Sequence, residues 1–382
     1  MNHKLSFTLQ WTSWFARAGE FLLNGIKVQT PCFMPVGTKG TIKGIPLELL
    51  GDQSSLPLWG TQSTQILLAN TMHLYLRPWD QVIRNHGWLH TFMNRNKLIL
   101  TDSWWFQIFS LGLNKTKTGK SMAKIHDDHV VFTSIHDGSK HIFTPTGTVD
   151  IQCNLWSDIM MMLDVCAPVQ NISKSQVHAY MSQTHRRAAM QFDHHQARYD
   201  QVKWSLFPII QWWLYTDLRK ESIDTLTPYA IDGIGIGGLS VGETLEEMEE
   251  MLAFMAPLLP PHIPRYLMGV WTPESMLLGI QYGIDMFDCV APTRLGRHGI
   301  AYQLGGNSKL THNKYKWSTS IGLADTCPCH VCKTYSLGYL NHLFNEWEML
   351  GGILLSLHNI AYLHHLCRCE REKILWKIIE DI

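Results

Sequence analysis

Several short apolar runs of this chain end in an acidic or amide residue. At or near the ends of these runs lie Asn70, Asp102, Asp164, Gln211, Gly238 and Asp288. Carboxylates act as nucleophiles or as general acids and bases, whereas amides and backbone N–H groups recognise the polar edges of a ligand. If the runs are parallel strands, their carboxyl ends meet at one edge of the fold. The sequence therefore predicts one pocket that carries three carboxylates.

A second group of residues, nearer the C-terminus, has the spacing of a metal site. The segment CPCHVC supplies Cys327, Cys329 and Cys332. His358 follows in SLHNI, which completes the pattern C-x-C-x2-C-x25-H. Three thiolates and one imidazole make a closed tetrahedral zinc site of the structural kind. We predict one structural Zn2+ per subunit, with His330 as a rival ligand that ranks below His358 because its ring must bend back beside its own neighbours.

The elements that position these residues follow from the apolar runs. Eight runs of four to eight residues suit strands buried on both faces: TPCFMPVGT, QILLAN, KLILTD, DIMMMLD, SLFPIIQ, DGIGIGG, RYLMGV and DMFDCV. Segments with helical spacing lie between several of them, as at 173–195 and 241–255. The alternation predicts the α/β class and a (β/α)8 TIM barrel, whose site lies at the carboxyl ends of the strands. We expect a barrel core over 1–300, a zinc-binding subdomain over 301–366 and a C-terminal helix over 367–382.

Composition sets the class of protein. In 382 residues, 45% are hydrophobic and 17% charged, which suits a large core, and Lys+Arg equals Asp+Glu at 32 each. Without a net charge, any nucleic-acid surface must be a local patch. No apolar run is long enough for a membrane span, no signal peptide is evident, and nine cysteines with three clustered favour a reduced, cytoplasmic protein.

Cys367 and Cys369 receive no role. Gly233, Gly235 and Gly238 spell G-x-G-x-x-G, but the acidic residue of a dinucleotide site does not follow.

Seven motifs together resemble one known family. TPCFMPVGT, ANTMHLYLRP, LTDS, IGGLSVGE, YLMGV, GIDMFDCVAPTR and the cysteine cluster occur in the order found in bacterial tRNA-guanine transglycosylases, from about residue 14 to residue 365. The resemblance implies a (β/α)8 barrel with a zinc subdomain, usually a homodimer. It also implies exchange of guanine at the anticodon wobble position (G34) of certain tRNAs for a 7-deazaguanine, preQ1, in queuosine biosynthesis.

The resemblance also implies roles for individual residues. Asp288 matches the nucleophile that attacks C1′ of the ribose and forms a covalent RNA–enzyme intermediate, and Asp102 matches the general acid/base. Residues that match the base-binding site are Asn70, Ser103, Phe106, Asp164, Cys166, Gln211, Gly238, Leu239 and Met268. Phe106 and Met268 match the pair that sandwiches the base. Arg294 and Arg297 match a surface for anticodon phosphates. Val165 and Met72 depart from the family, which usually has Glu and often an aromatic residue there.

Tryptophan is the largest departure from the family. The chain has 15 Trp against 12 Tyr and 14 Phe, although Trp is normally the rarest aromatic residue. Ten occur where the family has glycine: Trp14, Trp79, Trp88, Trp104, Trp105, Trp156, Trp212, Trp213, Trp271 and Trp347. Two interpretations stay open. The positions are UGA codons that the organism reads as glycine, or the protein is a paralogue whose pocket is blocked and strained by indoles and which serves as a non-catalytic RNA-binding or dimer-partner protein.

Overall fold

A circuit of short parallel strands forms the centre of the molecule. The computed structural model describes residues 5–50, 64–103, 123–134, 136–165, 172–199, 204–230, 232–323 and 327–380. All eight apolar runs form strands, with SLFPIIQ divided in two: β4 (Cys32–Pro35), β5 (Ile66–Asn70), β6 (Leu98–Asp102), β10 (Ile159–Met161), β11 (Ser205–Phe207), β12 (Ile209–Ile210), β13 (Ile234–Ile236), β14 (Arg265–Leu267) and β15 (Met286–Cys289). The α/β class is confirmed.

The strand pairings close on themselves. One parallel sheet has the order β11-β10-β6-β5 and the other the order β12-β13-β14-β15-β4. A parallel bridge between Val36 and Leu68 connects β4 with β5. At the other junction only Pro208 separates β11 from β12, because proline has no N–H to continue the ladder. This circuit has the strand order of a (β/α)8 barrel, and every parallel strand is buried along nearly its whole length.

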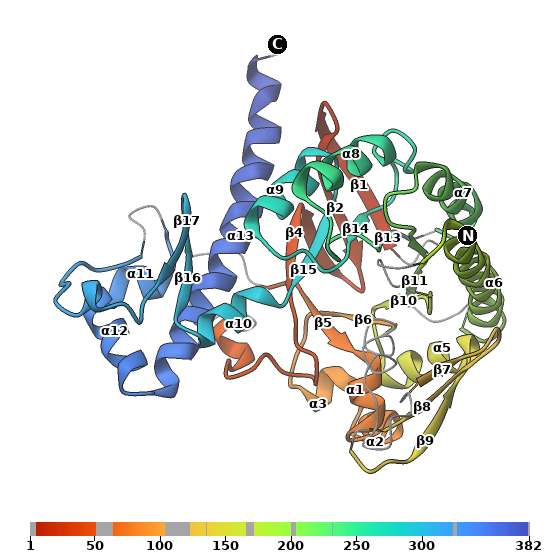
Figure 1. Cartoon of the computed structure of the whole chain (residues 1–382), viewed down its shortest axis with the longest axis horizontal. Helices are drawn as coiled ribbons and strands as arrows, with labels where there is room; N and C mark the ends of the chain where they lie inside the picture. Colours follow the sequence, from red (N-terminus) through yellow and green to blue (C-terminus); the bar gives the residue numbers. More distant parts are fainter. Residues whose placement is uncertain are drawn as a thin grey trace.

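Helices follow most strands and cover the outside of the circuit (Figure 1). They are α1 (Thr71–Leu76), α2 (Asp80–Asn85), α3 (Trp88–Phe92), α5 (Pro145–Leu155), α6 (Lys174–Tyr199), α7 (Thr216–Leu226), α8 (Leu245–Met255), α9 (Pro273–Gln281) and α10 (Ala291–Arg297), with 3-10 turns at Leu47–Leu50 and Thr227–Tyr229. The two long helices expected from sequence are α6 and α8. A capping box at Thr244 and Glu247 fixes the start of α8, because each side chain accepts the backbone N–H of the other residue.

Two small antiparallel sheets are additions that the sequence analysis did not predict. The first contains β1 (Leu5–Ser13), β2 (Ala16–Leu23) and β3 (Ile26–Thr30), and the second contains β7 (Ala123–Ile125), β8 (Val130–Thr133) and β9 (Lys140–Phe143). The first sheet precedes β4 directly, and its Phe21 and Val28 share a core with Met286 of β15. It therefore packs against one end of the strand circuit.

The C-terminal lobe has a core of its own. It contains the hairpin β16 (Ile300–Gln303) and β17 (Gly306–Lys309), a 3-10 turn at Asn313–Tyr315, and the helices α11 (His330–Thr334) and α12 (Leu337–Asn345). Helix α13 (Met349–Glu380) runs between this lobe and the strands (Figure 1). Its Leu355 and Ala361 belong to the core of the lobe, whereas its Leu357 and Leu363 belong to the main core. The expected boundary at residues 366 and 367 therefore falls inside one continuous helix.

Six tryptophans have a positive φ angle, the region that favours glycine. They are Trp14 (58°), Trp79 (98°), Trp88 (67°), Trp156 (59°), Trp213 (44°) and Trp347 (59°). The other non-glycine residues with positive φ in the described part of the chain are Asn24, Asn94 and Ser240. For a bulky side chain this conformation is an outlier, at a cost of about 1–2 kcal/mol per residue. Six such residues together would offset much of a typical folding free energy of about 5–15 kcal/mol.

Candidate active site

The strand-end residues line one cavity at the carboxyl ends of the strands. The cavity has a volume of about 300 Å³, at the lower end of the range for small-molecule sites. Its lining includes nine of the residues expected from sequence: Asn70, Asp102, Ser103, Asp164, Gln211, Gly238, Leu239, Met268 and Asp288. These residues come from seven different strands and the turns that follow them. Their convergence follows from the parallel circuit, in which every strand ends at the same edge.

Asp102 is held by its neighbour on the adjacent strand. Asn70 and Asp102 are paired residues in the parallel ladder between β5 and β6. Asn70 Nδ2 donates to Asp102 Oδ2 at 2.9 Å, while Asn70 Oδ1 accepts the N–H of His73 and caps α1. Asp102 Oδ1 has no hydrogen-bond partner among the described residues. One oxygen of this carboxyl is therefore fixed, and the other is left for a ligand.

Asp288 is held by two donors on the same oxygen. The hydroxyl of Tyr266 donates to Oδ1 at 2.7 Å, and the backbone N–H of Gly269 donates to it at 2.6 Å. Both donors come from β14 and its turn, next to β15. The second carboxylate oxygen takes no part in either bond. Burial raises the pKa of Asp288 above its usual value, and the bonds from Tyr266 and Gly269 act in the opposite direction.

Asp164 and Gln211 form a polar pair deeper in the cavity wall. The amide nitrogen of Gln211 donates to Asp164 Oδ2. Asp164 is 5% exposed, and burial raises its pKa to about 7, although nearby Arg187 and the hydroxyl of Ser103 favour the charged form. Burial also raises the pKa of Asp102 to about 7, with a smaller contribution from the charge of Asp288. The cavity therefore contains carboxyls that exchange protons near neutral pH.

Replacing Asp164 with asparagine is expected to stabilise the protein more at pH 8 than at pH 5. The pKa of Asp164 is raised in the folded state, so its ionisation costs stability that accumulates as the pH rises from about 4 to about 7. Asp164→Asn keeps the acceptor for Gln211 and removes this cost, with an expected gain of about 2–4 kcal/mol at pH 8. Thermal melts at the two pH values measure it. Asp217→Asn, at an exposed carboxylate, is the control, and an equal effect of Asp164→Asn at both pH values would contradict the explanation.

Two further residues support the site but were not found from sequence. Tyr266 was missed because an internal residue of an apolar strand carries no motif. Arg219, on α7, is fully buried, and its guanidinium donates to the carbonyl oxygens of Trp213 (2.8 Å), Gly237 (2.9 Å) and Gly238 (3.2 Å). Burial lowers its pKa to about 9. One arginine thereby fixes the two turns that follow β12 and β13.

The described tryptophans near the site do not fill the cavity. Trp212 is 2% exposed and packs in a core with Leu163 and Leu218, outside the cavity lining. Trp271 lines the cavity, and its indole N–H donates to the carbonyl oxygen of Ser240 at 2.7 Å. Of the tryptophans expected to block the pocket, Trp212 turns into the core and Trp271 stays at the lining, so neither closes the cavity formed by the described residues.

Several expected site residues lie elsewhere or outside the described part of the chain. Phe106 and Cys166, together with Trp104 and Trp105, are outside the described residues. Arg294 and Arg297 are exposed on α10, the helix that begins two residues after β15. The two departures from the family are Met72 and Val165, which are both buried and do not line the cavity.

The four expected metal ligands come together in the C-terminal lobe. The sulfur atoms of Cys327, Cys329 and Cys332 and a nitrogen of His358 all lie within 4.8 Å of one another, and all four residues are buried. His358 Nδ1 lies 3.8, 3.4 and 3.3 Å from the three sulfurs in chain order. Zn–S and Zn–N bonds of about 2.3 and 2.0 Å at tetrahedral angles require a separation of about 3.5 Å, so the cluster fits a metal ion of this kind.

The surroundings of the cluster orient its ligands. His358 Nε2 lies 2.7 Å from the carbonyl oxygen of Tyr302, which suits an N–H at Nε2 and leaves Nδ1 for a metal. Backbone N–H groups also approach the sulfurs, with Leu323 N at 3.4 Å from Cys332 Sγ. His330 instead lies 3.3 Å from the hydroxyl of Thr334 and is not part of the cluster. This geometry favours His358 over His330 as the fourth ligand.

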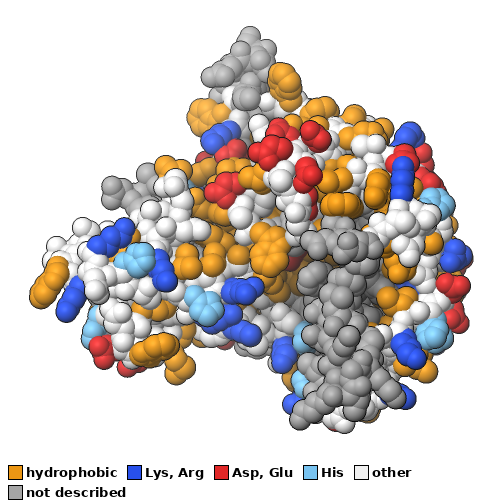
Figure 2. Space-filling model, in the orientation of Figure 1, with side chains coloured by type: hydrophobic (Ala, Val, Ile, Leu, Met, Phe, Trp, Pro, Cys, Tyr) orange, Lys and Arg blue, Asp and Glu red, His pale blue; other side chains and the backbone are white. Residues whose placement is uncertain are grey.

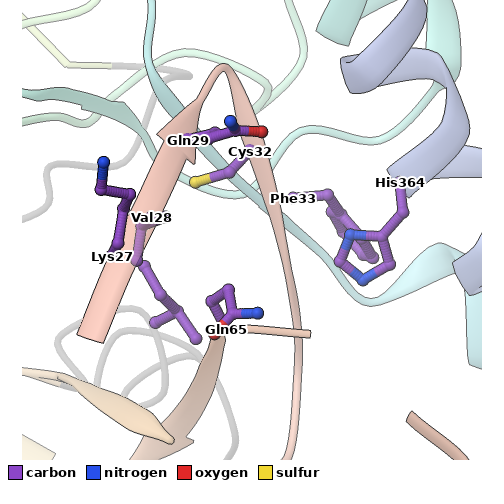
Figure 3. Close-up of a pocket in the computed structure, with 8 residues that line it drawn as sticks. Lys27, Val28, Gln29, Cys32, Phe33, Gln65 and His364 are labelled. Carbon is purple, nitrogen blue, oxygen red and sulfur yellow. The ribbon is translucent and has the colours of Figure 1, made fainter. Parts of the chain in front are cut away.

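A second cavity lies at the opposite ends of the strands. It has a volume of about 190 Å³, and Cys32, Phe33 and His364 are among its lining residues (Figure 3). His364 is 2.9 Å from the hydroxyl of Thr64, and burial lowers its pKa to about 4, so the ring is neutral. Because ligand sites of parallel α/β folds lie at the carboxyl ends of the strands, we assign no chemistry to this cavity.

The fold and the site define a parallel α/β protein with a carboxylate-lined cavity and a separate Cys3His cluster. Residues 12–380 match the family described as Queuine tRNA-ribosyltransferase. The chain is 43% identical to the Queuine tRNA-ribosyltransferase of Herpetosiphon aurantiacus, over 98% of this chain and 89% of the relative. The proteins of the same name from Dechloromonas aromatica and Helicobacter pylori are 42% and 40% identical, over 94% and 98% of this chain and 91% and 95% of theirs. The chain belongs to the queuine tRNA-ribosyltransferase family.

No helix in the described part of the chain is long and apolar enough to span a membrane.

Proposed function

We propose that this protein is a tRNA-guanine transglycosylase that exchanges G34 of the anticodon for preQ1 in queuosine biosynthesis. The observation that carries the proposal is that Asp102 and Asp288 line the same cavity from two different strands. One carboxyl oxygen of Asp102 has no hydrogen-bond partner among the described residues. Family membership supports the same reaction class. The test is incorporation of labelled guanine, and then of preQ1, into tRNA with a G34 anticodon.

The exchange takes place in two displacements. Asp288 attacks C1′ of the ribose, the C1′–N9 bond breaks, and its electron pair leaves with guanine, which receives a proton from Asp102. The entering base then gives its N9 proton to Asp102 and attacks C1′, which releases the Asp288 carboxylate. Two inversions retain the ribose configuration. Asp102 needs a pKa near the working pH because it acts as an acid in the first step and as a base in the second.

The cavity wall supplies the groups that recognise the base. Asp164 accepts hydrogen bonds from N1–H and the amino group of a guanine-like face, and Gln211 and the backbone of Gly238 face its O6. Met268 covers one face of the ring, with Phe106 proposed for the other. Asn70, Ser103 and Leu239 complete the base site, and Cys166 matches the bacterial preference for preQ1 over a larger base.

A basic surface for tRNA lies beside the cavity. Arg294 and Arg297 are exposed on α10, and α10 packs against α13 so closely that a Cβ on Gly296 would lie 2.5 Å from the backbone nitrogen of Ser356. Further exposed lysines of the lobe are Lys309, Lys314, Lys316 and Lys333, and Figure 2 shows basic side chains on this part of the surface. We propose that these side chains bind RNA phosphates.

The Cys3His cluster is proposed to hold one structural Zn2+ per subunit. A closed set of four protein ligands leaves no position for substrate, so the ion contributes to folding rather than to the exchange. The resemblance to bacterial transglycosylases further supports a homodimer in the cytoplasm.

Replacing Tyr266 with phenylalanine is expected to slow the exchange about ten-fold and to move the acid limb of the pH–rate profile to higher pH. The hydroxyl of Tyr266 favours the charged form of Asp288, so its loss raises the pKa of the nucleophile. Single-turnover exchange across pH 5–9 measures both effects. Tyr302→Phe is the matched control, because the Tyr302 hydroxyl is buried without a partner among the described residues. An unchanged pH profile in Tyr266→Phe would refute the positioning role.

A non-catalytic paralogue is the second candidate function. Its supporting observation is strain at Trp213, which stands at the turn after β12. Against it, the described residues form an open cavity, and the polar residues among them line it. Absence of guanine incorporation by a folded protein that carries tryptophan at every one of its 15 positions, with intact tRNA binding, would favour this second function.

A further inference from the structure

Two of the tryptophans with positive φ end helices in the same way. At the end of α5, the N–H of Trp156 donates to Cys153 O at 3.0 Å, and the N–H of Ser157 donates to Gln152 O at 3.2 Å. This pair of bonds is a Schellman motif, in which the residue in the left-handed conformation is usually glycine. Trp156 occupies that place with φ 59° and ψ 53°.

The same motif follows α12. The N–H of Trp347 donates to Phe344 O at 3.3 Å, and the N–H of Glu348 donates to Leu343 O at 2.8 Å. Trp347 again occupies the left-handed place, with φ 59°. Two helices thus end on the residue type least suited to the conformation that their hydrogen bonds require.

A third helix supplies the comparison within the chain. After α9, the N–H of Gly283 donates to Ile280 O at 3.1 Å, and the N–H of Ile284 donates to Gly279 O at 3.0 Å. Here the left-handed residue, with φ 80°, is glycine. The backbone of the two tryptophan sites is therefore the backbone of a glycine site.

Other tryptophans with positive φ also occupy glycine positions. Trp14 is the first of two residues between the paired ends of β1 and β2, where tight hairpin turns require φ > 0 and favour glycine. Trp79 has φ 98° and ψ 139°, close to a region that is essentially restricted to glycine. Trp88 follows Gly87, so two successive residues have positive φ at the start of α3.

The side chains of Trp14 and Trp347 gain little from the fold, whereas the indole of Trp156 packs against the main core and contacts the rings of Trp88 and Trp204. Trp14 and Trp347 are 94% and 93% exposed, so their indoles contribute almost no burial. Trp11 also packs against the main core, from β1, and Trp204 is 5% exposed. The feature that separates these two residues from the six is backbone conformation, because neither has a positive φ.

We infer that positions 14, 79, 88, 156, 213 and 347 are glycine in the protein that its native organism makes, and that their codons are UGA translated as glycine. Trp11 and Trp204 are true tryptophans encoded by UGG. The inference rests on backbone geometry, with side-chain exposure as further support at positions 14 and 347, and it is independent of the proposed activity. It places glycine at position 213, in the turn beside the base site. Glycine allows this turn more backbone conformations than tryptophan does.

Tandem mass spectrometry of the protein purified from its native organism tests the inference directly. Peptides that cover the six positions are expected to contain glycine, and peptides that cover Trp11 and Trp204 are expected to contain tryptophan. Sequencing of the gene is expected to give UGA in the transcript at the six positions and UGG at the other two. Tryptophan in the peptides at the six positions, or UGG codons there, would overturn the inference.

A stability comparison gives a second readout on the chain with 15 tryptophans. Trp14→Gly together with Trp347→Gly is expected to raise Tm by about 2–4 °C, because the residue with positive φ loses its steric cost while almost no packed surface is lost. The matched pair Trp11→Gly with Trp204→Gly is expected to lower Tm, because packed side chains are lost. An unchanged or lower Tm for the first pair would contradict the assignment of glycine to these turns.

Discussion

Asp288→Asn is expected to reduce guanine incorporation into tRNA by about 10³–10⁶-fold while the protein stays folded. An amide of the same shape keeps an oxygen to accept the bonds from Tyr266 and Gly269 but cannot form the ester-like bond to C1′. Two measurements test the expectation. They are the rate of labelled guanine exchange and the protein–RNA band on a denaturing gel, which is expected for the unsubstituted protein and absent from the variant.

Asp285→Asn is the control for a structural effect of the same substitution. Asp285 is a buried aspartate three residues earlier, and its carboxylate bonds to Arg17 and Thr30 rather than to the cavity. This variant is expected to melt at a lower temperature but to keep the protein–RNA band below its Tm. A covalent band that persists in Asp288→Asn would show that another residue is the nucleophile.

Cys329→Ser is expected to lower the metal content from one zinc per chain to nearly none and to unfold the C-terminal lobe. Structural zinc contributes on the order of 10 kcal/mol where ligands are brought together only by folding. Loss of one thiolate from the buried cluster removes most of this contribution, since the remaining ligands no longer close the site. Elemental analysis of the purified protein measures the zinc, and thermal melts measure the stability.

Three further variants separate the ligands from their neighbours. His358→Ala is expected to behave like Cys329→Ser, whereas His330→Ala keeps its zinc because His330 lies outside the cluster. Cys367→Ser tests a buried cysteine of α13 whose sulfur contacts Met276 instead, and it also keeps the metal. Full zinc occupancy in Cys329→Ser, or none in the unsubstituted protein, would refute the proposed centre.

The sequence predicted those parts of the fold in which the local pattern of apolar residues matches the burial of the folded element. The eight apolar runs form the parallel strands because strands buried on both faces have near-continuous apolar sequences. The polar residues at their ends meet in one cavity for the same topological reason. The Cys3His cluster was predictable because metal sites impose a recognisable thiolate spacing on a short loop.

Other parts of the site depend on contacts between segments far apart in the chain. Arg219 fixes two turns through a guanidinium buried under them, and Tyr266 reaches Asp288 across adjacent strands. Neither contact leaves a motif, because the partners are brought together only by the strand order. The small antiparallel sheets were missed because they lie outside the repeated pattern of apolar runs. Most residues of β1 alternate between exposed and partly buried, and β7 has only three residues, none of them fully buried.

The length of helix α13 bears on how the proposed enzyme would recognise its tRNA substrate. Its 32 residues span about 48 Å without interruption, and it packs on both the lobe and the strands. A continuous helix of this kind holds the basic surface of the lobe at a constant distance from Asp288. If the proposed function is right, we expect a tRNA with a shortened anticodon stem but the same loop to be exchanged less efficiently.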